Sequence, residues 1–175
     1  MPNWCFNGLT VTSKTTKKAL DTFLRKVKGP GGGRLLFNSL VPMPEELRSI
    51  HTGGTTIKGK SYRHWRGDGK NAKGISEREL AAITKRCGAR DWYDWACLNW
   101  GTKWDLPDNE NEGSFDRLGP LCARFIFDTA WGPPIVWCQK VAEMFPELCF
   151  SLKYNEPGRY LKGHEVFEAE IDPGQ

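Results

Sequence analysis

The tryptophan-rich stretch in the middle of the chain reads DWYDWACLNWGTKWD over residues 91–105. It contains four of the eight tryptophans of the chain, a density that neither helix nor strand propensity requires. A helix over residues 91–100 is predicted, because side chains three or four positions apart then form a wide apolar surface. Gly101 fits the left-handed position that commonly ends a helix. We expect this segment to be a packing hub, with FIFDTAWGPP (residues 125–134) as its counterpart, a strand that runs into a proline-started helix.

Length and composition favour one domain. At 175 residues and 39% hydrophobic content, the chain can form one proper core, and two independent cores would be small. The net charge of +4 is too mild to indicate nucleic-acid binding by itself. No apolar run is long enough to cross a membrane, and the N-terminus lacks the pattern of a signal peptide. A soluble protein located in the cytoplasm is therefore expected.

The cysteines are scattered along the chain and do not form close pairs. In a cytosolic chain such thiols are usually small buried hydrophobes. The sequence contains neither a Cys-x-x-Cys pair nor a close Cys/His pair, so no structural metal and no cofactor are predicted. The acidic loop at residues 105–113 departs from a calcium loop at several ligand positions, and a calcium site is rejected there.

Apolar alternation and helical spacing predict two strand-helix-strand groups. The predicted elements are a strand over 3–12, a helix over 13–28 capped by Ser13 or Thr15, a strand over 35–41, a strand over 121–130, a helix that Pro133 starts and Pro146 stops, and strands over 148–154 and 165–171. This order predicts an α+β fold of the ferredoxin-like split βαβ type, an antiparallel sheet with two helices on one face. Residues 1–175 are predicted to form that single domain, with a large basic, Trp-rich helical insertion at 48–116 that covers the other face or one end of the sheet.

The insertion gathers positive charge. Residues 48–90 contain eleven basic and three acidic side chains, a local net charge of +8. Glycines predict that the first half of this stretch is flexible, and residues 51–74 are predicted to be a loop. Helical character is expected only over 75–86, where Ser76 and Glu79 form a capping box.

Several segments resemble a family of phage and conjugative-plasmid proteins that carry a YubB-type ferredoxin-like domain. The resemblance rests on MPNWC with Asn7 (residues 1–7), FNSLVPMPEEL (37–47), NWGTKW (99–104) and TAWGPP (129–134). It implies a ferredoxin-like core and an origin in a mobile element. It implies no catalytic residues, because the family offers none to carry over.

Two groups of residues are candidates for binding a ligand or partner. The basic group interleaves cations with aromatic rings, as phosphate or nucleotide binding requires; the aromatic group offers ring faces for stacking together with polar contacts. The candidates are Lys60, Arg63, His64, Trp65, Arg66 and Lys70 in the first group, and Asn99, Trp100, Thr102, Lys103, Trp104 and Trp131 in the second. A solvated mobile loop and simple packing of tryptophans are the alternatives for the two groups.

No catalytic residues are predicted, because Cys97 has no histidine nearby in sequence to act as its base. The leading hypothesis is a non-enzymatic phage or plasmid accessory protein in the bacterial host cytoplasm. It binds an anionic partner, either a host defence protein or nucleoprotein complex such as CRISPR, or a nucleotide or nucleic acid, and so counteracts host defence. An enzyme acting on nucleotides or nucleic acid is the alternative.

Overall fold

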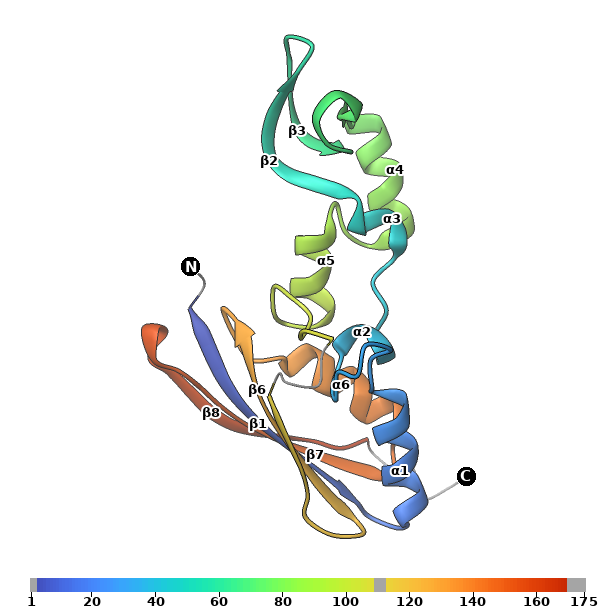
Figure 1. Ribbon diagram of the computed structural model, residues 1–175, viewed down its shortest axis with the longest axis vertical. Coiled ribbons are helices and arrows are strands. Elements are labelled where there is room, and N and C mark those ends of the chain that lie inside the picture. The colour runs from blue at the N-terminus through green and yellow to red at the C-terminus, as the bar shows by residue number, and fades with distance from the viewer. Residues whose placement is uncertain (1–2, 109–112, 170–175) are drawn as a thin grey trace. The chain divides into compact units, whose positions relative to one another are not determined.

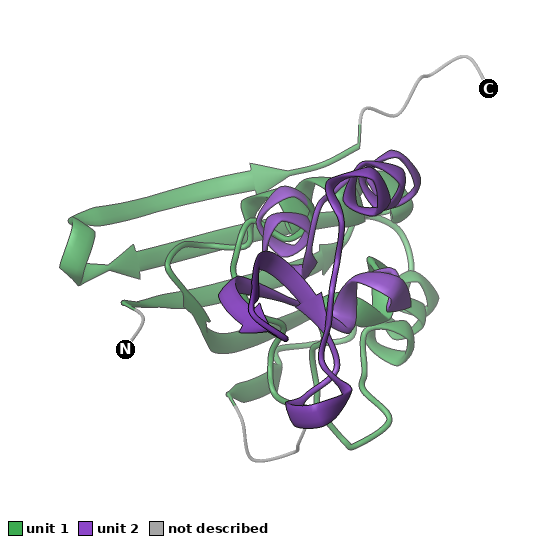
Figure 2. Cartoon of the chain, turned by 90° about the horizontal axis from the view of Figure 1, so that it is seen from above, with its two compact units in different colours: residues 1–42, 99–175 green, residues 43–98 purple. Residues whose placement is uncertain are grey.

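The computed structural model describes residues 3–108 and 113–169. The chain divides into two compact units, residues 1–42 with 99–175 and residues 43–98 (Figure 2). Parts of three sequence predictions lie outside the described residues: the start of the MPNWC segment, the centre of the acidic loop at 109–112, and the end of the last predicted strand.

The first unit contains a five-stranded antiparallel sheet in the order β5-β6-β1-β7-β8. Its strands are β1 (Trp4–Ser13), β5 (Ser114–Arg117), β6 (Cys122–Ala130), β7 (Leu148–Glu156) and β8 (Leu161–Phe167). Helices α1 (Lys17–Lys26) and α6 (Ile135–Met144) lie on one face of this sheet (Figure 1). The elements β1, α1, β5, β6, α6 and β7 follow the split βαβ order, and β8 extends the sheet beside β7. The predicted α+β fold with two helices on one face is confirmed.

The predicted strand over 35–41, the second strand of the predicted order, is wrong. Instead of a strand over 35–41, the chain forms the short helix α2 (Phe37–Leu40). The Asp105 carboxylate accepts hydrogen bonds from the backbone N–H groups of Phe37 (2.7 Å) and Asn38 (3.0 Å), so it satisfies the first turn of this helix. The strand that completes the order is β5, which begins inside the segment predicted as the insertion.

The cap of helix α1 also differs from the prediction. Thr16 is the N-cap, and its hydroxyl accepts a hydrogen bond from Ala19 N at 3.3 Å. Ser13 instead accepts from the N–H groups of Thr15 and Thr16 in the preceding turn.

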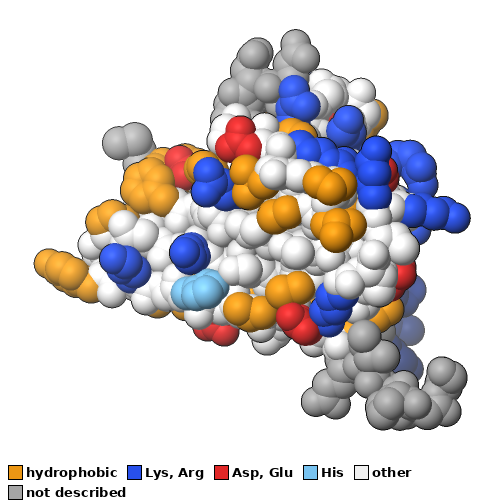
Figure 3. All heavy atoms as spheres, turned by 90° about the horizontal axis from the view of Figure 1, so that it is seen from below, with side chains coloured by type: hydrophobic (Ala, Val, Ile, Leu, Met, Phe, Trp, Pro, Cys, Tyr) orange, Lys and Arg blue, Asp and Glu red, His pale blue; other side chains and the backbone are white. Residues whose placement is uncertain are grey.

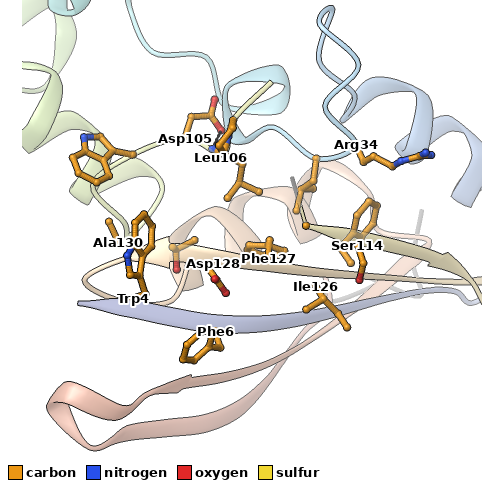
Figure 4. A pocket seen from close by; sticks show the side chains of 16 residues that line it. Trp4, Phe6, Arg34, Asp105, Leu106, Ser114, Ile126, Phe127, Asp128 and Ala130 are labelled. Atoms are coloured by element: carbon orange, nitrogen blue, oxygen red, sulfur yellow. Dashed lines mark hydrogen bonds between the residues drawn. The ribbon is translucent and has the colours of Figure 1, made fainter. Parts of the chain in front are cut away.

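The two faces of the sheet differ in exposure. On β1, alternate side chains from Cys5 to Val11 are buried on the side of the helices. Phe6, which points the other way (Figure 4), is 51% exposed. The side of β1 opposite the helices is therefore an open face.

Aromatic rings form the core between helices and sheet. Phe23 of α1 makes edge contacts with Phe125 and Phe150, whose ring centroids lie 6.4 and 5.3 Å away. Trp137 of α6 is fully buried, and its indole N–H donates to the Phe37 carbonyl at 3.1 Å. This bond fixes α2 to α6 inside the first unit.

The second unit has its own small sheet. The strands β2 (Ile50–Ile57), β3 (Lys60–Arg66) and β4 (Lys73–Gly74) are antiparallel in that order. The remaining elements are α3 (Glu45–Arg48), the 3-10 turn η1 (Gly69–Asn71), α4 (Glu77–Cys87) and α5 (Trp92–Asn99), whose last residue belongs to the first unit. The prediction of a loop over 51–74 is wrong, because most of that segment is hydrogen-bonded strand.

The helix predictions for this part of the chain are confirmed. Ser76 caps α4 by accepting a hydrogen bond from Glu79 N at 3.3 Å. The tryptophan-rich stretch forms α5, and Gly101 follows with a φ of 83°. Trp95 and Trp100 are buried, whereas Tyr93 and Trp104 are each 40% exposed. The stretch thus contributes to the core on one side only.

Candidate functional site: a basic pocket and an apolar cavity

The predicted binding residues are divided between the two units. The basic group from Lys60 to Lys70 lies in the second unit, and the aromatic group from Asn99 to Trp131 lies in the first.

The β2–β3 hairpin presents the basic group. Its turn has positive φ at Lys58 (49°) and Gly59 (77°), between the paired residues Ile57 and Lys60. Positive φ at both central residues defines the tight turn whose twist matches two antiparallel strands. The β-branched residues before Lys58-Gly59 and the aromatic residues after it are the signal by which the hairpin could have been recognised in the sequence.

One face of β3 is structural. His64 is 5% exposed, and its Nε2 lies 3.3 Å from a carboxylate oxygen of the buried Asp91. Arg66 donates to Glu79 at 3.1 Å and to Glu46 at 3.4 Å. Both predicted binding residues are thus engaged by acidic groups of their own unit.

The opposite face of the hairpin carries a pocket. Its volume is about 550 Å³, and it lies against Trp65, with Lys58 and Lys70 in its wall. The Trp65 ring stacks on the His51 ring at a centroid distance of 5.3 Å and an interplanar angle of 21°. Asp68 is the acidic residue of the wall, and its carboxylate lies 3.5 Å from His51 Nε2.

The cations around this pocket differ from Arg66 in their surroundings. Lys58, Arg63 and Lys70 are exposed, and within residues 3–108 and 113–169 none of them forms an ion pair. Lys60 lies over the Tyr62 ring, 5.5 Å from its centroid. Exposed cations beside an indole can bind a phosphate-bearing ligand that has a planar group.

Most of the aromatic group has structural contacts. The Trp100 indole N–H donates to the Val41 carbonyl at 2.9 Å, and the Thr102 hydroxyl donates to the Ala130 carbonyl at 2.8 Å. Asn99 accepts a hydrogen bond from Lys140. These contacts favour the packing interpretation for Trp100 and Thr102 over ligand binding.

The other members of the aromatic group lie at the surface of the first unit. Lys103 Nζ lies over the Trp104 ring, 4.3 Å from its centroid, and Trp104 contacts Trp4 with centroids 6.4 Å apart. Trp131 is 41% exposed with a φ of 75°, and its carbonyl accepts from Arg159 at 3.4 Å.

A larger cavity, of about 820 Å³, lies beside these surface rings at the edge of β6 (Figure 4). Its walls are mainly apolar and include Trp4, Leu106 and Phe127, while Arg34 and Asp128 bring charge to it. Among the described residues, strand β5 pairs with β6 over residues 123–126, and the cavity lies along the part of β6 that follows this pairing. Trp4 and Phe6 were not among the predicted site residues, although their alternation along the first strand was the signal for them.

Comparison with known proteins agrees with this architecture. Residues 99–171 match the family model described as "Ferredoxin-like domain in Api92-like protein". The sheet-bearing unit is a ferredoxin-like domain. The chain is also similar to the crystal structure of the protein api92 from Yersinia pseudotuberculosis, with a TM-score of 0.53, 13% sequence identity and 100% of each chain covered. At that identity the likeness concerns the fold. Among curated proteins, none matches the chain.

The ferredoxin-like domain contains thiols that are shielded rather than activated. Burial raises the pKa of Cys5 to about 11, and it raises the pKa of Cys138 still further. Burial, with help from the nearby Glu168, raises the pKa of Cys149 to about 11. A nucleophilic cysteine needs a lowered pKa, so none of these three is prepared for attack at neutral pH.

In the described parts of the chain, no three His, Cys, Asp or Glu side chains are grouped so that they could hold a metal ion. Among the described helices, none has the length and apolar character that a membrane span needs.

Proposed function

We propose that the protein is a non-enzymatic accessory protein that binds an anionic partner through the Trp65 pocket of its second unit. The observation that carries this proposal is the placement of Lys58 and Lys70 in the wall of a pocket whose aromatic side is Trp65. The indole offers a stacking face for a planar ring, and the two ammonium groups offer charge to phosphates.

The size of the pocket favours a small ligand. A volume of about 550 Å³ lies within the range of sites that hold cofactors and other small molecules. Gly69 lines the pocket with a φ of 53°, and a glycine allows a ligand to approach the backbone closely. A nucleotide has the planar base and the negative charge that these groups complement.

A biological role follows from the family resemblance in the sequence. Proteins of phages and conjugative plasmids act inside a bacterial host, where a nucleotide-binding protein can remove a signalling nucleotide from a defence pathway. We propose this sequestration as the counter-defence role. Exposed Arg63, outside the pocket on the same strand, favours a second candidate, contact with a nucleoprotein defence complex such as CRISPR.

The proposal is tested by isothermal titration of the purified protein with a panel of mononucleotides and cyclic dinucleotides. Wild-type protein should bind at least one of them, and the double variant K58S/K70S should weaken that binding at least about tenfold. Lys85→Ser, an exposed lysine in the last turn of α4, is the matched control and should leave affinity unchanged.

Three results would contradict the proposal. If no nucleotide of the panel binds, the small-ligand form fails. If the double variant binds as well as wild type, the pocket is not the site. If a bound nucleotide is turned over, the enzymatic alternative replaces the binding protein.

A further inference from the structure

The open face of the ferredoxin-like sheet contains a glycine at a position where the backbone conformation does not require one. Gly8 lies in the middle of β1 and does not adopt a positive φ, and a Cβ placed on it would meet nothing within 4 Å. Glycine weakens a strand by comparison with a β-branched residue. An interior strand glycine is typical of places where a ligand or another backbone approaches closely.

The sheet register defines what surrounds this gap. Gly8 pairs with Ile126 on one side and Lys153 on the other, and Lys153 pairs with His164 on β8. In the next row of the register, Phe6 pairs with Asp128. Gly8 has no side chain and so leaves a gap in the surface of the sheet. The Phe6 ring on β1 lies beside this gap, and the basic side chains of Lys153 on β7 and His164 on β8 lie across from it. The underside of the sheet shows hydrophobic side chains mixed with lysines, arginines and a histidine (Figure 3).

An aromatic side chain of the face is available for stacking. Phe6 is 51% exposed, and it points away from the cavity, on the other side of β1 from the Trp4 ring (Figure 4).

This mixture fits single-stranded nucleic acid better than a protein surface. The cores of protein interfaces are depleted of charged side chains, whereas Lys153 lies next to the gap in the centre of this face. Unpaired bases stack on exposed aromatic rings of an antiparallel sheet, and their phosphates bind nearby cations. The Asp128 carboxylate, in the row of Phe6, can accept a hydrogen bond from an exocyclic amino group of a base.

We propose that the open face of this sheet binds unpaired single-stranded nucleic acid, with bases on Phe6 and over Gly8, and with phosphates at Lys153 and His164. This inference goes beyond the proposed function, because it concerns a different surface in the other unit and another class of ligand.

Fluorescence anisotropy with labelled single-stranded RNA and DNA of about 12 nucleotides tests the proposal. The full-length protein should bind the single strand at least about tenfold more tightly than a duplex of the same sequence. Phe6→Ala removes a stacking ring and should weaken binding about tenfold. Gly8→Val fills the gap and should weaken binding at least as much, while its melting temperature stays equal or rises, because the added side chain has room and favours strand.

Met144→Ala is the control for a lost surface hydrophobe. Met144 is 51% exposed on α6, which packs on the opposite side of the sheet, so affinity should stay within about twofold of wild type. Lys153→Ser should lower the slope of log affinity against log salt by about one.

The proposal is overturned if duplex binds as tightly as the single strand, or if folded Gly8→Val keeps wild-type affinity. It is also overturned if K58S/K70S, rather than Gly8→Val, abolishes oligonucleotide binding, because the nucleic acid would then occupy the Trp65 pocket. If the nucleotide titration shows no binding, the proposal for the Trp65 pocket fails, but the oligonucleotide result on the sheet is unaffected. The two proposals can therefore fail separately.

Discussion

The His64 imidazole and the Asp91 carboxylate lie 3.3 Å apart in the second unit, and each side chain is only 5% exposed. The same carboxylate also accepts a hydrogen bond from Asp94 N at 2.9 Å, so Asp91 caps the start of α5 while it binds β3. One buried side chain therefore joins the helix start to the sheet of this unit.

The Asp91 pair is tested by two substitutions. Asp91→Ala removes both acceptors and should lower the free energy of unfolding by about 1–3 kcal/mol. Asp91→Asn keeps a capping oxygen and should lower it less. Urea unfolding followed by circular dichroism measures both variants; equal losses would show that the cap contributes nothing beyond the contact with His64.

The Glu46 ion pairs give the second unit a pH dependence. A hydrogen bond from Arg86 holds the pKa of Glu46 below its ordinary value of 4.5, and the charges of Arg86 and Arg66 add to this effect. A lowered folded-state pKa stabilises the fold at pH values above 4.5, and this stabilisation is lost as the pH falls through the folded-state value. Urea unfolding of wild type and Glu46→Gln over the acidic range should show a difference that is largest near neutral pH and shrinks in acid. A difference independent of pH would contradict this account.

Arg66 should differ from the cations on the opposite face of its hairpin. Arg66→Ser leaves Glu46 and Glu79 without a shared partner and should lower the melting temperature measurably. Arg63→Ser and Lys70→Ser remove exposed cations and should change the free energy of unfolding by less than about 0.5 kcal/mol. Differential scanning fluorimetry compares the three. Equal melting temperatures would show that the ion pairs of Arg66 contribute little.

Glu156 is a buried carboxylate in the ferredoxin-like domain. It is 0% exposed, and neither of its side-chain oxygens has a hydrogen-bond partner among the described residues. Burying an unpaired carboxylate is unfavourable, so Glu156→Gln should raise the free energy of unfolding by about 1–2 kcal/mol. Glu165→Gln on the exposed edge strand β8 is the control, with little change expected. A less stable Glu156→Gln would mean that the carboxylate has a favourable partner in solution.

Cysteine reactivity should follow exposure and pKa. Cys97 is exposed, whereas Cys5 and Cys138 are buried and their pKa values are raised, which lowers the thiolate fraction at pH 8. Timed alkylation with iodoacetamide, followed by peptide mass spectrometry, should modify Cys97 first and the other two only after unfolding. Cys97→Ser should remove the fast phase, and fast modification of Cys5 in the folded protein would contradict the prediction.

Local patterns account for the elements that were predicted correctly. The Ser76 cap depends on Glu79, three residues away, and the end of α5 depends on the conformational freedom of Gly101. In β1 and β6 the alternation of apolar side chains identifies strands without knowledge of their neighbours. All of these signals lie within a few residues of the element that they predict.

Long-range contacts account for the elements that were missed. The segment around Phe37 is apolar enough to read as a strand, and it becomes a helical turn because Asp105, distant in sequence, caps it. Strand β5 has four residues, too few for a periodic signal, and exists through its pairing with β6. His64 and Arg66 were predicted to bind a ligand or partner. In the structure His64 instead contacts Asp91, and Arg66 forms ion pairs with Glu46 and Glu79.

The sequence by itself determined the α+β class, the Ser76 cap of α4, the end of the tryptophan-rich helix and the place where positive charge gathers, because these depend on side chains close together along the chain. The tertiary structure alone decided which face of β1 is covered and which cations are neutralised. Both helices pack against the face of the sheet that carries Cys5, so Phe6 and Gly8 on the other face are left uncovered. Acidic groups from other elements form ion pairs with Arg66 but, among the described residues, not with Lys70. Burial and ion pairing depend on which distant segments meet, and no local pattern contains that information.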